Sequence, residues 1–269
     1  MPPTNTCRVE ISPAQAEVDI LGANELAGAT DQLRSKVEID ADIDLAQAER
    51  AARTQLCDRH QQILRASAIS DDRIRLWETI SEATDLPPEL VGWGDKAVPC
   101  MATTWRTVSG ALVPQIRLDK EIPQKNGRST RYLFPKDCGG IVGVDAAFCH
   151  HLDNITIPAL LVEGTKQFQA AASTINPEHP FAVPFGIAGC WGWSKDFKPS
   201  ADLLALPAEN RDILVCFDAD ITTNWMVWEA ARRLERYLLS ELGARSVRCQ
   251  ATCGIGPPAT RNLAHPLRP

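Results

Sequence analysis

Three acidic residues follow two short apolar runs of the sequence. Residues 156–163 end on Glu163, and residues 213–217 are followed directly by Asp218 and Asp220. Such runs are typical of buried strands in a parallel sheet. Two strands of this kind can bring the carboxylates at their ends around one divalent cation. The sequence therefore predicts a Mg²⁺ or Mn²⁺ site made by the three acids.

Each acid has a plain alternative. Glu163 can ligate a cation or move a proton, and Gly164 lets the backbone turn sharply there, yet Glu-Gly after a strand is also a common turn. Asp218 and Asp220 point to the same side if the chain is extended, but Asp-x-Asp is also common in solvated loops and helix caps. Lys166 either meets a phosphate, pairs with Glu163, or is solvated.

A loop rich in glycine and tryptophan lies between the two acidic motifs. It reads Gly189-Cys190-Trp191-Gly192-Trp193. Such a loop can stack a nucleic-acid base, although tryptophan often simply covers the edge of a core.

The C-terminal half alternates strand and helix patterns and is predicted to hold these acids on an α/β sheet. The expected strands are 157–162, 181–187, 213–217 and 246–250, and the expected helices are 166–173, 200–206 and 225–242. Units of this length favour a parallel sheet flanked by helices. Apolar residues form a stripe along the last helix, and Gly243 is the expected residue beyond its end.

The N-terminal half has a different pattern. We expect a flexible tail over 1–36, a helical region over 37–97 that includes a helix from Ser70 through Ile80, and a small β-rich lobe over 98–150. The lobe's expected strands are 101–108, 112–118 and 131–134, with Asn126-Gly127 as a turn before the last of them. Gln115, Arg117 and Asp119 alternate with apolar residues, so they share one face of a strand, which either lies outward or contacts a substrate.

The order strand, Glu-Gly, helix, strand, Asp-x-Asp, helix resembles the Toprim domain of bacterial primases, topoisomerases and some nucleases. The residues that carry the resemblance are Val162 to Ser173, the Gly-x-Trp-Gly-Trp loop, and Phe217 to Asp220 with Asn224. They are similar to a Toprim-like family of unknown function that occurs in phage, plasmid and integrated-element proteins, often fused to a replication helicase. The similarity runs from about His60 to Arg248, and the Toprim-like α/β domain is placed at 151–250.

The resemblance implies phosphoryl or nucleotidyl transfer in the replication of a mobile element, with Glu163, Asp218 and Asp220 as catalytic and metal-binding residues. It also implies nucleic-acid or phosphate contacts at Lys166, Gln115, Arg117 and Tyr132, because the family has a similar Gln-x-Arg-x-Asp patch and Tyr-Leu-x-Pro segment. The expected partners are nucleotides, DNA in either single-stranded or duplex form, and a replicative helicase. The family continues into a third acidic motif, whereas 251–269 reads as an irregular tail without acids, as a truncation would leave.

Bulk composition limits these readings. The net charge of −6 and the pI of about 5.4 argue against binding nucleic acid through bulk attraction, so any contact must be local. Nine cysteines without a Cys-x-x-Cys pair indicate reduced thiols. The sequence has neither a signal-peptide pattern nor a long apolar stretch, which predicts a cytoplasmic protein that does not enter membranes.

Two alternatives to an active Toprim enzyme remain open. One is a degenerate Toprim module that binds DNA or a replication partner without turnover. The other is a phosphatase of the haloacid-dehalogenase type, because Phe217 to Thr222 fits an apolar-Asp-x-Asp-x-Thr pattern with Asp218 as nucleophile.

Overall fold

The computed structural model describes residues 49–124, 129–136, 138–218, 221 and 223–251. The chain divides into two units, Met1–Arg53 and Thr54–Pro269, and residues 49–53 of the first unit are helical. The predictions for the 1–36 tail, the Asn126-Gly127 turn, Asp220 and residues 252–269 lie outside the described residues. No helix in the described ranges is long and apolar enough to cross a bilayer.

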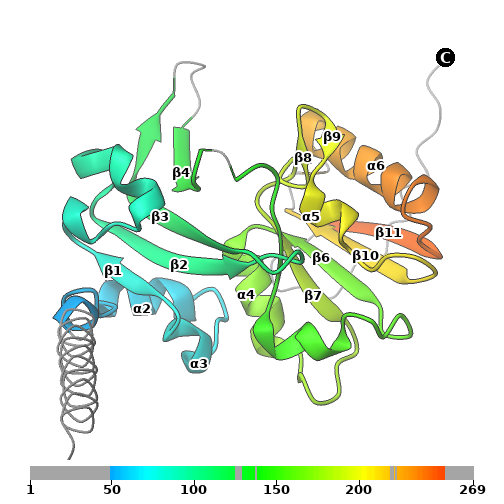
Figure 1. Ribbon diagram of the computed structural model, residues 1–269, viewed down its shortest axis with the longest axis horizontal. Coiled ribbons are helices and arrows are strands. Elements are labelled where there is room, and N and C mark those ends of the chain that lie inside the picture. The colour runs from blue at the N-terminus through cyan, green and yellow to red at the C-terminus, as the bar shows by residue number, and fades with distance from the viewer. Residues whose placement is uncertain (1–48, 125–128, 137, 219–220, 222, 252–269) are drawn as a thin grey trace, which may run out of the picture. The chain divides into compact units, whose positions relative to one another are not determined.

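A five-stranded sheet forms the C-terminal part of the second unit (Figure 1). Its order is β11-β10-β6-β7-β5, and the first four of these strands pair in parallel while β5 is antiparallel to β7. The strands are β5 (Val142–Val144), β6 (Ala159–Glu163), β7 (Val183–Ile187), β10 (Asp212–Phe217) and β11 (Ser246–Ala251). The predicted α/β arrangement with a parallel sheet is confirmed in this general form.

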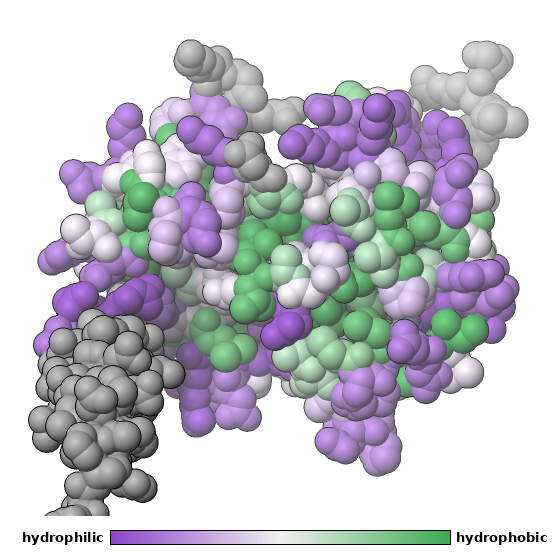
Figure 2. Space-filling model, in the orientation of Figure 1, coloured by the Kyte–Doolittle hydropathy of each residue, from purple (hydrophilic) through white to green (hydrophobic). Residues whose placement is uncertain are grey.

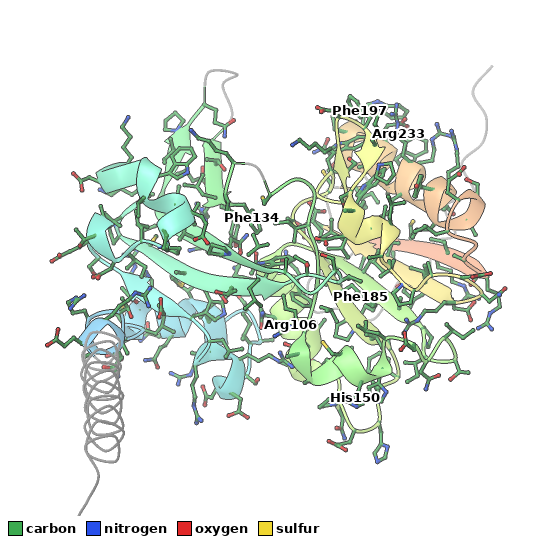
Figure 3. The ribbon with its side chains drawn as sticks, viewed as in Figure 1. Arg106, Phe134, His150, Phe185, Phe197 and Arg233 are labelled. Atoms are coloured by element: carbon green, nitrogen blue, oxygen red, sulfur yellow. The ribbon has the colours of Figure 1, made fainter. Side chains whose placement is uncertain are left out.

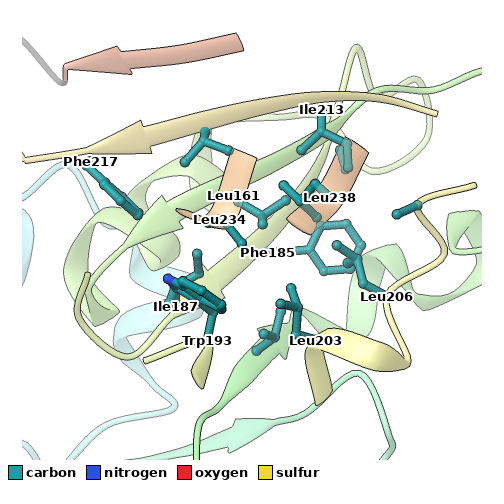
Figure 4. Packing of buried hydrophobic residues seen from close by; sticks show 14 of the residues in the cluster. Leu161, Phe185, Ile187, Trp193, Leu203, Leu206, Ile213, Phe217, Leu234 and Leu238 are labelled. Atoms are coloured by element: carbon teal, nitrogen blue, oxygen red, sulfur yellow. The ribbon is translucent and has the colours of Figure 1, made fainter. Parts of the chain in front are cut away.

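Three helices connect these strands close to their predicted positions: α4 (Thr165–Thr174), α5 (Ala201–Leu204) and α6 (Trp225–Ser240). The side chain of Asn224 accepts a hydrogen bond from the Met226 N–H and caps α6. Gly243 has φ 67° and follows its end. The apolar stripe of α6 packs with strand residues such as Phe185 and Ile213 in a continuous core (Figure 4), so the helix is held mainly by this burial.

The second sheet is antiparallel, in the order β1-β2-β3-β4. Its strands are β1 (Glu78–Ile80), β2 (Cys100–Arg106), β3 (Leu112–Pro123) and β4 (Ser129–Leu133). One face is apolar and packs against the turns η1 (Ala83–Asp85) and η2 (Pro88–Ala97). The other face carries Gln115 and Arg117, which are both buried, so it is not a solvated outer face.

The expected helix through Ile80 is wrong. The helix α3 (Asp71–Ile74) ends after one turn, and Glu78–Ile80 pairs with β2 as a strand. The N-terminal helix α2 (Asp58–Arg65) packs with α3 through a small core that includes Trp77 and Met101. Ser70 therefore does mark the start of a helix, as predicted, but the pairing of Glu78–Ile80 with β2 overrides helix propensity after Ile74.

Trp105 joins the two sheets. Its ring lies 5.4 Å from that of Phe168 on α4 and 5.7 Å from that of Phe134. A Cβ atom added at Gly143 would lie 2.4 Å from the Trp105 ring, and one added at Gly186 would lie 2.8 Å from it. Both glycines are thus needed because the indole packs directly against the backbone of β5 and β7.

Candidate functional site

The ends of β6 and β10 bring two of the predicted acids together. The carboxylate of Glu163 accepts a hydrogen bond from the backbone N–H of Asp218, with an N···O distance of 3.3 Å. Leu161 and Val162 pair with Val215 and Cys216 in the parallel ladder, so the two strands reach this edge in register. Glu163 and Asp218 are both partly buried. Adjacent carboxylates repel each other unless a cation or hydrogen-bond donors compensate their charge.

A glutamine on α4 supplies one such donor. The Nε2 amide of Gln167 donates to Oδ1 of Asp218 at 2.9 Å. Gly164 precedes α4 with φ 83°, a conformation that disfavours any side chain at this turn. The turn places the start of α4 beside the end of β10, so Gln167 reaches back from the third position of the helix.

Lys166 lies at the same end of α4 and is half-buried. Its Nζ donates to Oγ of Ser67 at 3.1 Å. Burial lowers the pKa of Lys166, the cations Arg117 and Arg131 lower it further, and Asp218 opposes the shift. Lys166 of α4 therefore lies within electrostatic reach of Asp218 and of two arginines of the antiparallel sheet, Arg117 on β3 and Arg131 on β4.

Arg117 and Tyr132 face each other across the β3–β4 pair. The Arg117 guanidinium carbon lies 5.9 Å from the centre of the Tyr132 ring. Arg117 is 8% exposed, and its Nε has no hydrogen-bond partner among the described residues. A buried donor in this state costs stability unless another molecule satisfies it.

Gln115 has a structural contact. Its Oε1 accepts hydrogen bonds from the Trp105 indole at 3.1 Å and from the Thr165 hydroxyl at 2.6 Å. These bonds tie β2 and β3 to the first residue of α4. The predicted contact of Gln115 with nucleic acid stays a prediction.

The glycine-tryptophan loop follows β7. Gly189 has φ 90°, and its N–H donates to the Ile187 carbonyl at 2.8 Å. Trp193 is buried in the core of the α/β sheet, whereas Trp191 is only partly buried. Trp193 therefore covers a core, and Trp191 extends from that core toward the surface.

The residues fit part of a divalent cation site. Carboxylate oxygens are the ligands that Mg²⁺ and Mn²⁺ prefer, and Glu163 and Asp218 supply them at one sheet edge. Within the described ranges no group of three His, Cys, Asp or Glu side chains is arranged to hold a metal. Asp220, the third predicted ligand, lies outside those ranges.

Several contributors to this region escaped the sequence reasoning. Gln167 could have been noticed, because glutamine at the third position of a helix often turns back toward its start. The buried ring of His60 bridges the Thr79 hydroxyl at 2.8 Å and the Asp119 carboxylate at 2.9 Å. These contacts join residues far apart in the chain, and no local pattern marks them.

Comparisons with known proteins give one solved structure. The crystal structure of the Aquifex aeolicus primase, containing its zinc-binding and RNA polymerase domains, matches with a TM-score of 0.45 and 12% sequence identity. The match covers 72% of this chain and 49% of the primase chain, so the chain spans about half the length of that structure. Neither a protein-family model nor a curated protein matches the sequence.

Proposed function

We propose that this chain is a Toprim-like protein that binds Mg²⁺ or Mn²⁺ and acts on nucleic acid by phosphoryl or nucleotidyl transfer related to primer synthesis. One observation carries the proposal: the carboxylate of Glu163 contacts the backbone of Asp218 where two parallel strands end. The carboxyl edge of such a sheet is the usual position of a ligand site in open α/β folds.

The residues around this edge have distinct roles in the proposal. Asp218 and Asp220 would hold the cation, and Glu163 would ligate it or move a proton. A bound divalent cation would neutralise charge on the transferred phosphate. Lys166 and Arg117 contact phosphate oxygens, and the unsatisfied Nε of Arg117 supports this role because a phosphate oxygen would accept its proton.

The proposed partners follow from this chemistry. They are nucleotides and single-stranded DNA, whose phosphates the cations at Lys166, Arg117 and Arg131 would meet. A replicative helicase is the proposed protein partner.

Metal binding tests the proposal directly. We expect Mn²⁺ binding, followed by electron paramagnetic resonance of the full chain, to weaken about tenfold or more in Asp218→Asn and Glu163→Gln. Asp212→Asn is the matched control, because it makes the same change at the opposite end of β10. Mn²⁺ affinity that is equal in Asp218→Asn and Asp212→Asn would remove the metal site.

Turnover assays separate the proposal from the two alternatives. If the protein synthesises primers on a single-stranded template and Asp218→Asn abolishes this synthesis, the result supports nucleotidyl transfer. Metal-dependent binding of DNA without primer synthesis would instead indicate a binding module without turnover. Hydrolysis of an aryl phosphate that is lost in Asp218→Asn would instead indicate a phosphatase with Asp218 as nucleophile.

A further inference from the structure

Aromatic and arginine side chains lie against one another on α6 and on the β8–β9 hairpin, formed by Ser194–Lys195 and Lys198–Pro199. We call this the aromatic-arginine surface; it consists of Trp191, Phe197, Trp225, Trp228, Arg232 and Arg233. Trp225 and Phe197 are 65% and 68% exposed. Hydrophilic residues gather over the hairpin (Figure 2).

Glu229 orders the two arginines. Its carboxylate accepts from Nε of Arg233 at 2.7 Å and from Nε of Arg232 at 3.3 Å. Among the described residues no acceptor binds the terminal Nη groups of either arginine. Each guanidinium therefore has donors left for an anionic ligand.

Each arginine also lies over an aromatic ring. The guanidinium carbon of Arg233 is 5.3 Å from the centre of the Phe197 ring, and that of Arg232 is 5.5 Å from the Trp228 ring. Figure 3 shows Phe197 and Arg233 next to each other at the end of the hairpin. These cation–π contacts keep Arg233 beside the exposed Phe197 ring and Arg232 beside the partly buried Trp228 ring.

Two tryptophan rings of this surface are stacked on each other. Trp225 and Trp228 have ring centroids 4.7 Å apart and planes at 24°. Because Trp225 is the first residue of α6, this stack lies at the N-terminal end of α6, a few residues after Asp218 in the sequence.

Phe197 occupies a position that local structure disfavours. Asp196 and Phe197 form the two-residue turn between β8 and β9, and their φ angles are 52° and 62°. Glycine, asparagine and aspartate are the residues suited to this turn, so Asp196 fits it, whereas a bulky side chain such as that of Phe197 is strained in the left-handed region. A large apolar side chain that is both strained and exposed gains little from folding, which points to a role outside the fold.

We propose that the aromatic-arginine surface binds single-stranded nucleic acid, with unpaired bases stacked on Trp225 and Phe197 and phosphates held by Arg232 and Arg233. A single strand exposes both base faces and phosphates, which the rings and cations of this surface can bind, whereas a duplex hides its base faces. The inference rests on the proposed function, because it supplies the same active edge with its template.

The test measures binding of a fluorescently labelled oligothymidylate to the full chain by anisotropy, with Mg²⁺ and again with EDTA. We expect Phe197→Ala and Trp225→Ala each to weaken binding about tenfold under both conditions, the scale of one lost base stack. Phe181→Ala is the matched control, because Phe181 is also 68% exposed and precedes β7. Its affinity should equal that of the wild type.

A second variant separates binding from folding. Phe197→Gly relieves the backbone strain, so the midpoint of urea unfolding should hold or rise while binding falls about tenfold. A purely structural phenylalanine would show the reverse, with lower stability and unchanged binding, and that result would overturn the proposal. Equal affinity for duplex and single-stranded DNA would overturn it as well. The same measurement with single-stranded RNA compares the affinities for ribose and deoxyribose strands.

The same assay distinguishes this inference from the proposed function. If Asp218→Asn loses only the Mg²⁺-dependent part of binding while Phe197→Ala and Trp225→Ala bind as the wild type does, the surface fails and the metal site stands. If both ring variants bind weakly but Asp218→Asn retains its affinity for Mn²⁺, the surface stands and the metal proposal fails.

Discussion

The two sheets of the second unit use their polar residues in different ways. The antiparallel sheet β1–β4 buries them on one face. There Gln115 accepts hydrogen bonds from Trp105 and Thr165, and the His60 ring forms hydrogen bonds with Thr79 and Asp119. The α/β sheet has an apolar interior and places Glu163 and Asp218 where strands end. Gln115 and His60 thus fix the positions of their neighbours, whereas the partly exposed acids Glu163 and Asp218 remain accessible to a ligand.

This difference separates structural from chemical residues. A fully bonded polar group inside a sheet contributes to specific packing, and its loss should appear as lower stability. A carboxylate at a strand end contributes little packing, and its loss should appear as lost ligand binding. Substitutions in the two sheets therefore should change different measurements.

Trp105→Ala is expected to have the largest effect on stability. The ring is 2% exposed and packs with Phe134, Phe168 and the glycine backbones of the α/β sheet. Its truncation should cost about 3–5 kcal/mol, measured by urea unfolding of the full chain. The same substitution at exposed Trp225 should change stability by about 0.5 kcal/mol or less. Equal losses in the two variants would show that the sheets are not joined through this indole.

Gln115→Leu should have a smaller effect. It removes the acceptor shared by Trp105 and Thr165 and leaves two buried donors, so we expect a loss of about 1–3 kcal/mol in the free energy of unfolding. In the double variant Gln115→Leu with Thr165→Val one of these donors is also gone. The double variant should therefore lose less than the sum of the single variants. Strict additivity would mean that the Gln115–Thr165 bond contributes nothing.

The sequence predicted the α/β sheet well because its signals are local. Short apolar runs and Gly243 beyond α6 each lie within a few residues of the boundary they mark. The strand-end motifs also placed Glu163 and Asp218 on neighbouring strands. Their catalytic and metal roles, and the position of Asp220, stay predictions.

The first sheet was harder to predict, because its determinants are distant in sequence. The strand β1 exists through pairing with β2, although its own residues follow a cap signal that predicts a helix. The α/β part has long-range contacts of this kind as well: Arg211, directly before β10, is fully buried and donates to the carbonyls of Ile157 and Leu152, more than fifty residues away. A charged residue gives no local sign that the fold will enclose it.

The exposed ion pair of the α/β sheet should have the smallest effect. Arg245 donates to Asp212 at 2.9 and 2.5 Å, and Ser246 donates to the same carboxylate. The hydrogen bond from Arg245, then that from Ser246, lowers the pKa of Asp212 below its usual value. A lowered pKa adds stability above the unfolded-state pKa of about 3.9, and this contribution declines as the pH falls below that value.

Asp212→Asn should therefore lower the free energy of unfolding slightly at pH 7, and the difference from the wild type should shrink as the pH falls below about 4. High salt should shrink it too, because the pair is exposed. Asp153→Asn is the control, since that exposed side chain has no partner among the described residues, and it should show neither trend. A loss in Asp212→Asn as large as that in Gln115→Leu would break the contrast, because polar contacts at the strand ends of the α/β sheet would then stabilise the fold as much as those buried in the antiparallel sheet.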